Sequence, residues 1–420
     1  MLQCDLISTK RTPMQTISFD FYATFVLMAL VLLLGGFIIR RVHFLRFYNI
    51  PEAVVGGLIA AIVLLGIRIV GDIEFKFDSG LKDPLMLAFF TSVGLMADFG
   101  SLKKGGKRLI VFLAVICVLL VIQNIAGIGV AKLMGQDGLL GLLASSVTMS
   151  GGHGTGAAWA SVFSAEPYYF DGAMEVAMAS ATFGLVVGGI IGGPVATHLI
   201  KKYALVSAEN KASGTVDSAT SFEQADMQRR ITQDTFTKSI SLIAICLFVG
   251  SSAAALVKGL NLSWTLPTFV YCLFTGVILR NVLSALKVHQ VFDREIGMIG
   301  NVSLALFLAF SLMSINLLQL ASLAVPILVI LVVQAIIMAA YAIFVTFRFC
   351  GKDYDAAVLA AGHCGFGLGA TPTAMVNMQA VCKNYGMSAI AFIIVPLCGA
   401  FFVDIANAFV IQLFVMFLGF

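Results

Sequence analysis

The fold is decided by Ser150-Gly-Gly-His-Gly-Thr-Gly156 and Gly362-His-Cys-Gly-Phe-Gly-Leu-Gly369, which lie about half a chain apart. Both stretches sit in apolar surroundings where an unbroken membrane helix would otherwise be expected. Glycine costs roughly 1 kcal/mol per residue relative to alanine in a helix interior, so we expect the helix to break in each stretch. Irregular backbone at membrane depth is tolerated only where protein or a water-filled cavity surrounds it. The two stretches therefore predict a transporter with two opposed re-entrant hairpins.

The composition is that of a polytopic membrane protein. Of the 420 residues, 60% are hydrophobic and only 11% are charged, whereas about a quarter of a soluble domain is charged. The first 20 residues contain no apolar core, so we do not expect a cleaved signal peptide. The eight cysteines show no CxxC spacing, which argues against a zinc site or a disulfide framework. Nothing in the charge pattern indicates nucleic-acid binding.

Apolar runs predict ten transmembrane helices, because about 17 to 25 such residues cross a bilayer. Residues 296–347 carry no acid or base over 52 positions, so this run is expected to cross twice and to turn near 316–322. The predicted spans are 21–39, 51–70, 84–97, 109–131, 176–198, 239–257, 259–279, two within 296–347, and 388–413. We therefore expect an all-α fold.

The ten spans divide into two repeats of five. The first repeat covers residues 1–200 with a hairpin at about 139–165, and the second covers 239–420 with a hairpin at about 354–382. A polar connector, 201–238, separates them. Because five is an odd number of crossings, the two repeats must have inverted topology.

The basic residues predict the orientation. With both termini outside, 19 of the 26 Lys and Arg residues fall on the inner side. Positive residues favour the cytoplasmic side, so we expect the connector to be a cytoplasmic loop.

A broken helix can bind an anion and a cation. Its free N–H groups and positive dipole end attract an anion, while unwound carbonyls replace the hydration shell of a small cation. Close helix packing is the alternative role for these glycines. The predicted substrate-binding residues are Ser150, Gly152, His153, Gly154, Thr155, Gly156, Gly365, Phe366, Gly367, Gly369, Thr371 and Thr373.

Polar residues inside the spans are candidate cation ligands, because an intramembrane acid is a functional candidate by default. Asp404 lies in the last span and Asn407 follows one helical turn later. A structural hydrogen bond between helices is the alternative role. The predicted cation ligands are Asp404, Asn407, Asn301 and Asn124.

Two further features have alternative interpretations. His153 and His363 follow glycines in the two stretches, where they either couple transport to protons or hold their loops by hydrogen bonds. The glycines of 184–193 recur at four-residue spacing, which suits either a sliding surface or close static packing.

The sequence closely resembles the bacterial sodium/glutamate symporters. The resemblance is carried by the ten residues from Ser150 to Trp159, by Gly362 to Ala374 and by Asp83-Pro-Leu-Met-Leu-Ala-Phe-Phe90, and it extends from about Phe21 onward. It implies a sodium-coupled importer of glutamate in the bacterial inner membrane, with Na⁺ as coupling ion and no cofactor. It also implies a homodimer surrounded by lipid, with an elevator-like movement of the hairpin-bearing part against a scaffold.

Other classes of function fit less well. An enzyme would need a nucleophile with a base, or a set of metal ligands, and the sequence offers neither. A channel would show filter motifs contributed by several subunits. The alternative that stays open is a sodium- or proton-coupled transporter of another small anion, such as a dicarboxylate.

Overall fold

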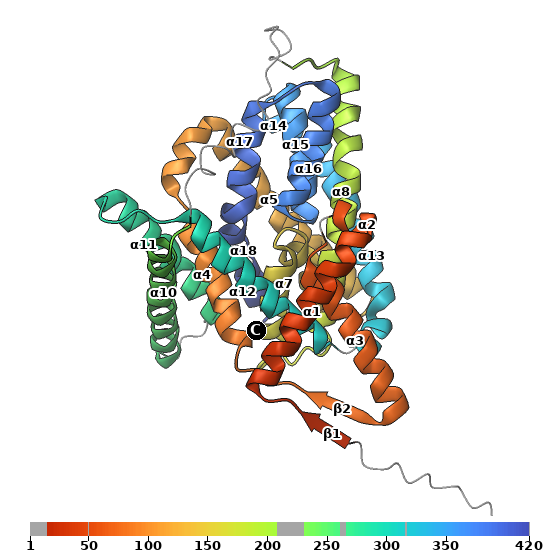
Figure 1. Ribbon diagram of the computed structural model, residues 1–420. Coiled ribbons are helices and arrows are strands. Elements are labelled where there is room, and N and C mark those ends of the chain that lie inside the picture. Colours follow the sequence, from red (N-terminus) through yellow and green to blue (C-terminus); the bar gives the residue numbers. More distant parts are fainter. Residues whose placement is uncertain (1–14, 49, 208–230, 261–265, 316, 420) are drawn as a thin grey trace, which may run out of the picture.

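The fold is a bundle of helices (Figure 1), seen in a computed structural model that describes residues 15–48, 50–207, 231–260, 266–315 and 317–419. The first half contributes α1 (Phe21–Arg41), α2 (His43–Phe47), α3 (Glu52–Gly71), α4 (Lys82–Met96), the 3-10 turn η1 (Phe99–Ser101), α5 (Leu102–Leu133), α6 (Gly138–Leu142), the π-helical η2 (Leu143–Val147), α7 (Gly152–Phe163) and α8 (Ala173–Tyr203). The second half contributes α10 (Gln233–Gly259), α11 (Thr268–Leu286), α12 (Asp293–Met313), α13 (Leu317–Tyr341), the π-helical η4 (Ala342–Thr346), α14 (Phe347–Phe349), α15 (Tyr354–Leu368), α16 (Thr371–Tyr385), α17 (Ala389–Leu397), the π-helical η5 (Cys398–Phe402) and α18 (Val403–Phe417).

A two-stranded parallel sheet is the one departure from the all-α expectation within the described residues. Strand β1 (Gln15–Ser18) pairs with β2 (Ile73–Lys76), which follows α3. Phe19 stacks on Phe77 at the end of this sheet, with ring centroids 5.6 Å apart. The segment before α1 is thus fastened to the far end of α3, at the bottom of Figure 1.

Eight of the helices are long and apolar enough to cross a membrane, which identifies a polytopic membrane protein. They are α1, α3, α5 from Gly106 onward, α8, α10, α11, α12 and the helix from Leu323 to Phe349. The spans predicted at 84–97 and 388–413 are not among these eight helices. Helix α4 has 15 residues, and the chain from Ala389 to Phe417 is interrupted by η5.

Two predicted boundaries were wrong. The span predicted at 259–279 begins at Thr268, after Pro267, and ends at Leu286. A proline suits the start of a helix, and α10 already occupies the chain as far as Gly259. The turn predicted at 316–322 comes earlier, since α12 ends at Met313 and α13 begins at Leu317. An uninterrupted apolar run gives no compositional mark of where its helices end.

The helices pack as two groups. We call α1, α3, α4, α10, α11 and α12 the scaffold group, because α4 packs against α11 and α12, and α3 packs against α1 and α12. We call α5 to α8 together with α13 to α18 the hairpin group, in which α8 packs against α7, α13, α15 and α16. In each predicted repeat, the first three spans belong to the scaffold group. The last two spans and the hairpin between them belong to the hairpin group.

Corresponding helices in the two halves begin at a constant spacing. The starts of α3 and α11, of α6 and α15, and of α8 and α17 are each 216 residues apart. The helices α6 and α15 are both capped by an aspartate. Asp137 accepts from the N–H of Leu139 at 2.8 Å, and Asp353 accepts from the N–H of Ala356 at 2.9 Å. Such spacing is what a duplicated unit predicts.

Two contacts within the scaffold group involve corresponding positions of the two halves. A Cβ on Gly57 of α3 would overlap Leu312 of α12, and a Cβ on Gly94 of α4 would overlap the backbone of Leu273 in α11. Gly57 and Leu273 are 216 positions apart, and Gly94 and Leu312 are 218 apart. The contact of α3 with α12 therefore matches that of α11 with α4, as a two-fold relation requires.

The two hairpins enter the bundle from opposite ends of α5. Near the end of α5, Lys132 Cε lies 3.6 Å from the Cβ position of Gly138, where the first hairpin begins. Near the start of α5, Arg108 binds Asp353 at the base of the second hairpin. The first hairpin is α6, η2 and α7, and the second is the packed pair α15 and α16.

The breaks fall at the edges of the glycine stretches rather than inside them. The first hairpin turns at Ser150–Gly151 and the second at Gly369–Ala370, so most of the glycines are helical. Their main role in the arms is close approach. A Cβ on Gly365 would overlap the backbone of Ala374 in α16, which shows how closely the two arms of the second hairpin pack.

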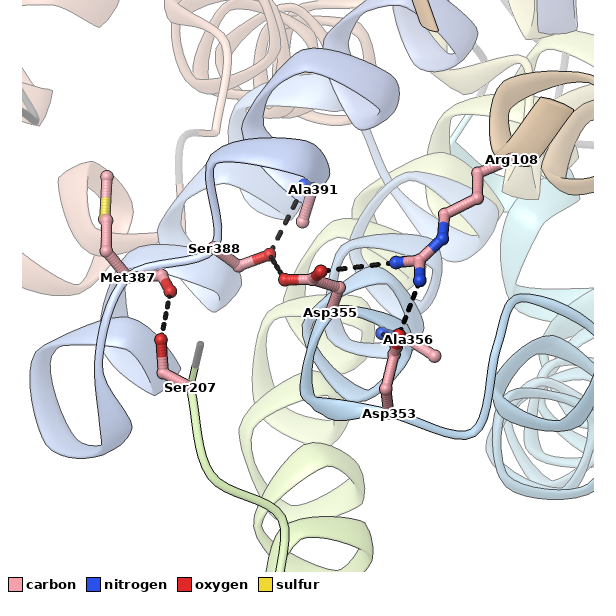
Figure 2. A network of polar contacts seen from close by, with 8 residues as sticks. All are labelled: Arg108, Ser207, Asp353, Asp355, Ala356, Met387, Ser388 and Ala391. Atoms are coloured by element: carbon pink, nitrogen blue, oxygen red, sulfur yellow. Dashed lines mark hydrogen bonds and ion pairs between the residues drawn. The ribbon is translucent and has the colours of Figure 1, made fainter. Parts of the chain in front are cut away.

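The base of the second hairpin is held by a polar network (Figure 2). Arg108 of α5 contacts Asp353 Oδ2 at 2.6 Å and Asp355 Oδ2 at 3.2 Å. Ser388, which caps α17, donates to Asp355 Oδ1 at 2.7 Å. The end of α8 reaches the same region, because Ser207 donates to the carbonyl of Met387 at 2.7 Å. Three loops of the hairpin group thus meet near the start of α5 at one end of the bundle.

Replacing Arg108 by alanine should loosen this base, because it leaves two adjacent carboxylates without their cation. The side chains of Arg108 and Asp353 are partly exposed, so solvent screening limits the expected loss to about 1 kcal/mol of unfolding free energy. A lower melting temperature in detergent is the measurement. The control is Lys107→Ala, which removes the same charge from the exposed neighbouring position. Equal melting temperatures for both variants would contradict the network's role.

The scaffold contact at Gly94 gives a second prediction. Gly94→Ala places a methyl group against the backbone of Leu273, which cannot move aside, and should lower the free energy of unfolding by about 1–3 kcal/mol. Gly66→Ala on α3 is the control, since a Cβ there meets no atom within 4 Å. Thermal unfolding should show a lower Tm for Gly94→Ala alone. An unchanged Tm would mean that α4 and α11 are not in close contact.

Candidate functional site

The tips of the two hairpins meet inside the hairpin group. The Cβ position of Gly152, which starts α7, lies 3.4 Å from the carbonyl oxygen of Gly369 at the second break. Gly152 has φ +65°, a left-handed conformation that glycine adopts without strain. The helices that leave the two breaks, α7 and α16, have Gly151 and Ala370 as N-caps, and neither receives a side-chain hydrogen bond there. Two uncapped helix N-termini therefore lie side by side.

Gln123, in the middle of α5, connects the two tips. Its Nε2 donates to the carbonyl of Gly367 at 2.9 Å, and its Oε1 accepts from the Ser150 hydroxyl at 2.9 Å. The carbonyl of Gly367 also lies 3.2 Å from Ser150 Oγ. Gln123 is fully buried, so these bonds are shielded from solvent.

A second buried polar group surrounds Ser146 in η2. The N–H of Ser146 donates to Asn124 Oδ1 at 3.1 Å, and its carbonyl accepts from Asn407 Nδ2 at 2.8 Å. Three atoms in this group are buried without a hydrogen-bond partner, namely Ser146 Oγ, Asn407 Oδ1 and Asn124 Nδ2. Such atoms are costly in a protein interior, and an unplaced water or ion is one explanation for them.

Gln334 of α13 extends this polar group. Its Nε2 donates to the backbone carbonyl of Gln123 and to the hydroxyl of Ser145, both at 2.8 Å, and its Oε1 is buried without a partner. Ser145 has a non-helical backbone (φ −118°, ψ −132°) within the π-helical η2. Single π-helical turns are frequent at functional sites, where they free backbone groups for other contacts.

Asp404 lies in the first turn of α18, beside the first hairpin's second arm, α7. The hydroxyl of Thr155 in α7 is 3.4 Å from Asp404 Oδ1. Asn407, one turn later on α18, reaches Ser146 instead. The two residues predicted to share a helix face therefore both contact the first hairpin.

The two histidines make structural hydrogen bonds. His153 Nε2 lies 3.0 Å from the Thr182 hydroxyl of α8, and His363 Nδ1 lies 2.8 Å from the Thr346 hydroxyl of η4. Each contact joins a hairpin helix to a neighbouring helix. His363 Nε2, however, is buried without a partner.

The remaining glycines of the stretches face other helices. A Cβ on Gly154 would lie 2.7 Å from the Phe89 ring of α4, and one on Gly156 would lie 2.9 Å from Thr148. On the second hairpin, a Cβ on Gly367 would lie 2.8 Å from Met338 Sδ. Gly154 is thus the point at which the first hairpin touches the scaffold group.

The other predicted residues divide between the tips and the surrounding helices. The Phe366 ring is buried and stacks on His363, with centroids 5.1 Å apart. Thr371 Oγ1 faces Gly399 of η5, while Thr373 is buried beside α8 with its hydroxyl unpartnered. Asn301 is exposed on α12 and does not join the polar groups described above.

The sequence analysis missed Gln123, Ser145 and Ser146 as site residues. The available signal was the pair Gln123-Asn124, which interrupts an otherwise apolar stretch of α5, and the Ser145-Ser146 pair before the first glycine stretch. Both pairs lie at the depth where the hairpin tips meet. Only the packing shows that they face one another.

Two of the α8 glycines, Gly184 and Gly188, pack closely against α15. A Cβ on Gly184 would overlap the Leu368 carbonyl, and one on Gly188 would lie 3.0 Å from the Cys364 carbonyl. Both contacts lie between α8 and α15, which are members of the same hairpin group. These two glycines are therefore inside the hairpin group, whereas a Cβ on Gly189 would lie 3.3 Å from the Tyr48 ring at the end of α2.

Comparison with known proteins assigns the family. A family model described as Sodium/glutamate symporter matches residues 17–387. The chain is 54% identical over 397 residues to the Sodium/glutamate symporter of Escherichia coli (strain K12), covering 94% of this chain and 98% of the relative. It is 50% identical over 392 residues to that of Haemophilus influenzae, covering 93% and 96% respectively. The chain therefore belongs to the sodium/glutamate symporter family, whose members are membrane transporters and not enzymes.

Proposed function

We propose that the chain is a sodium-coupled symporter of L-glutamate that works by alternating access in the bacterial inner membrane. The observation that carries this proposal is the meeting of two uncapped helix N-termini, those of α7 and α16, at the touching tips of opposed hairpins. A helix N-terminus binds an anion through its free N–H groups and its dipole. The names of the relatives supply glutamate and Na⁺ as the solutes.

The substrate site is proposed at the tips. The first-turn N–H groups of α7 and α16 would receive the glutamate carboxylates, and hydroxyls beside them would add hydrogen bonds without adding charge. Glycine at the tips leaves room for the substrate to approach the backbone. The residues proposed to line this site are Ser150, Gly152, His153, Gly154, Thr155, Gly156, Gly365, Phe366, Gly367, Gly369, Thr371 and Thr373.

The sodium site is proposed where buried oxygens lack a partner. Ser146 Oγ and Asn407 Oδ1 are such oxygens, and Asn124 fixes the backbone of Ser146. Hard cations prefer oxygen ligands. Asp404 would supply the compensating charge from beside Thr155. Asn301 is left out because it is exposed on another helix group.

The same geometry gives a reason for coupling. Asp404 contacts the first turn of α7, which is also the proposed place of a substrate carboxylate. Two negative groups this close repel each other strongly in a low-dielectric interior. A sodium ion bound between them removes that repulsion, so each solute strengthens the binding of the other.

Alternating access is proposed to occur by an elevator-like movement of the hairpin group against the scaffold group. The division of the helices into two internally packed groups supports it, as does the side-chain contact of α7 with Phe89 and Leu304 of the scaffold. The constant 216-residue spacing and the matching scaffold contacts support two inverted repeats of five spans, ten in all, with the connector 201–238 between them. A homodimer follows from the resemblance alone.

The proposed orientation puts both termini outside and the connector in the cytoplasm. The network of Figure 2 supports it, because the loops that it joins include many of the basic residues expected on the cytoplasmic side, such as Lys107, Lys201 and Lys352. The first hairpin would then be re-entrant from outside and the second from the cytoplasm.

Uptake into proteoliposomes tests the function. An inward sodium gradient should drive accumulation of labelled glutamate, and replacing sodium by potassium should abolish it. Unlabelled aspartate and malate serve as competitors. Proton-driven uptake without sodium, or displacement by malate in place of glutamate, would instead favour a transporter of another anion.

Asp404→Asn should weaken sodium binding more than glutamate binding, because it removes the only charge proposed to face the ion. We expect the sodium concentration for half-maximal uptake to rise by on the order of tenfold, which corresponds to about 1.4 kcal/mol. The exposed Asp171→Asn is the control and should behave as wild type. An unchanged sodium dependence in Asp404→Asn would remove Asp404 from the site.

Gly152→Ala should abolish uptake while the protein still inserts in the membrane. The left-handed φ at Gly152 costs a residue with a side chain about 1–2 kcal/mol, which would distort the tip without unfolding the bundle. Gly129→Ala on α5 is the control, since a Cβ there meets no atom within 4 Å. Size-exclusion chromatography checks folding, and wild-type uptake by Gly152→Ala would reject the tip assignment.

A further inference from the structure

We propose that Gln123 is a positioning residue that holds the two hairpin tips in register and links the sodium site to the substrate site. This inference rests on the proposed function and deepens it. It starts from one buried side chain that bonds to both hairpins, Ser150 on the first and Gly367 on the second. These partners are 217 residues apart in sequence.

The amide group suits this task because it carries a donor and an acceptor on one rigid plane. The donor, Nε2, serves the Gly367 carbonyl, and the acceptor, Oε1, serves the Ser150 hydroxyl. A leucine would offer neither, and a carboxylate would offer only acceptors. The two hydrogen bonds thus require an amide or a protonated acid at this position.

The Gly367 carbonyl needs an external donor. It lies in the last turn of α15, whose final carbonyls have no partner within the helix because the chain breaks at Gly369–Ala370. The site is fully buried, so water does not replace the missing bond. Gln123 therefore acts as the C-terminal cap of the second hairpin's first arm.

The neighbouring residue ties the same turn of α5 to the proposed sodium site. Asn124 accepts from the N–H of Ser146, and Gln334 binds the Gln123 carbonyl together with the Ser145 hydroxyl. A sodium ion that moves Ser146 must therefore act on the turn that carries Gln123. This contiguous set of hydrogen bonds gives coupling between the two sites a physical path.

The variants Gln123→Glu and Gln123→Leu test the proposal in proteoliposomes. The protonated form of Gln123→Glu has an O–H donor and a carbonyl acceptor in place of the amide, while its ionised form lacks the donor. Glutamate uptake by Gln123→Glu, divided by that of wild type at the same pH, should rise about tenfold between about pH 8 and about pH 5. Gln123→Leu should show a higher KM for glutamate and a higher half-maximal sodium concentration at both pH values.

Three controls make the result decisive. Gln379→Glu, at an exposed position on α16, should show no such pH dependence. Size-exclusion chromatography separates misfolding from loss of transport. Gln123→Glu has nearly the same side-chain volume as wild type, so it is the variant to measure if Gln123→Leu does not fold. A KM for glutamate and a half-maximal sodium concentration in Gln123→Leu that both equal those of wild type would overturn the role of Gln123, while wild type still transports. Absence of sodium-driven glutamate uptake by wild type would instead overturn the proposed function.

Discussion

The structure depends on one constraint, which is that helices broken inside a membrane leave backbone groups that water cannot satisfy. At the second break the carbonyl of Gly367 is bonded by Gln123, and near the first break the carbonyl of Ser146 is bonded by Asn407. Both donors are side-chain amides brought from other helices. The amides of α5 and α18 thus bond backbone carbonyls at or near the two breaks, and both amides are buried.

At the breaks, the backbone carbonyl groups and the helix N-termini have different hydrogen-bond partners. Carbonyls of the incoming arms are bonded within the protein, whereas the N-termini of the outgoing arms, α7 and α16, receive no side-chain cap. The centre of the hairpin group thus presents two positive helix ends that no side chain caps. In our proposal this imbalance selects an anion, and Asp404 beside the same turn makes that anion depend on a cation.

Glycine has different uses in different parts of the chain. At Gly152 it allows a left-handed turn, at Gly184 and Gly188 it brings α8 onto α15, and at Gly57 and Gly94 it closes the scaffold group. At Gly94 and Gly184 the close contact is with the backbone of another helix in the same group. The contact at Gly154, by comparison, is with side chains of the scaffold, Phe89 and Leu304, which are easier to rearrange. This difference suits the movement that we propose between the two groups.

The sequence by itself determined the membrane class and most helix positions, because apolar length acts locally along the chain. It also pointed to Asp404 and Asn407. Only the tertiary structure decided where the helices break, that Asn301 is exposed, and that Gln123 reaches Gly367 across 244 residues of sequence. The partner of a buried amide depends on which helix faces meet, and that is set by packing between distant segments, which local composition does not encode.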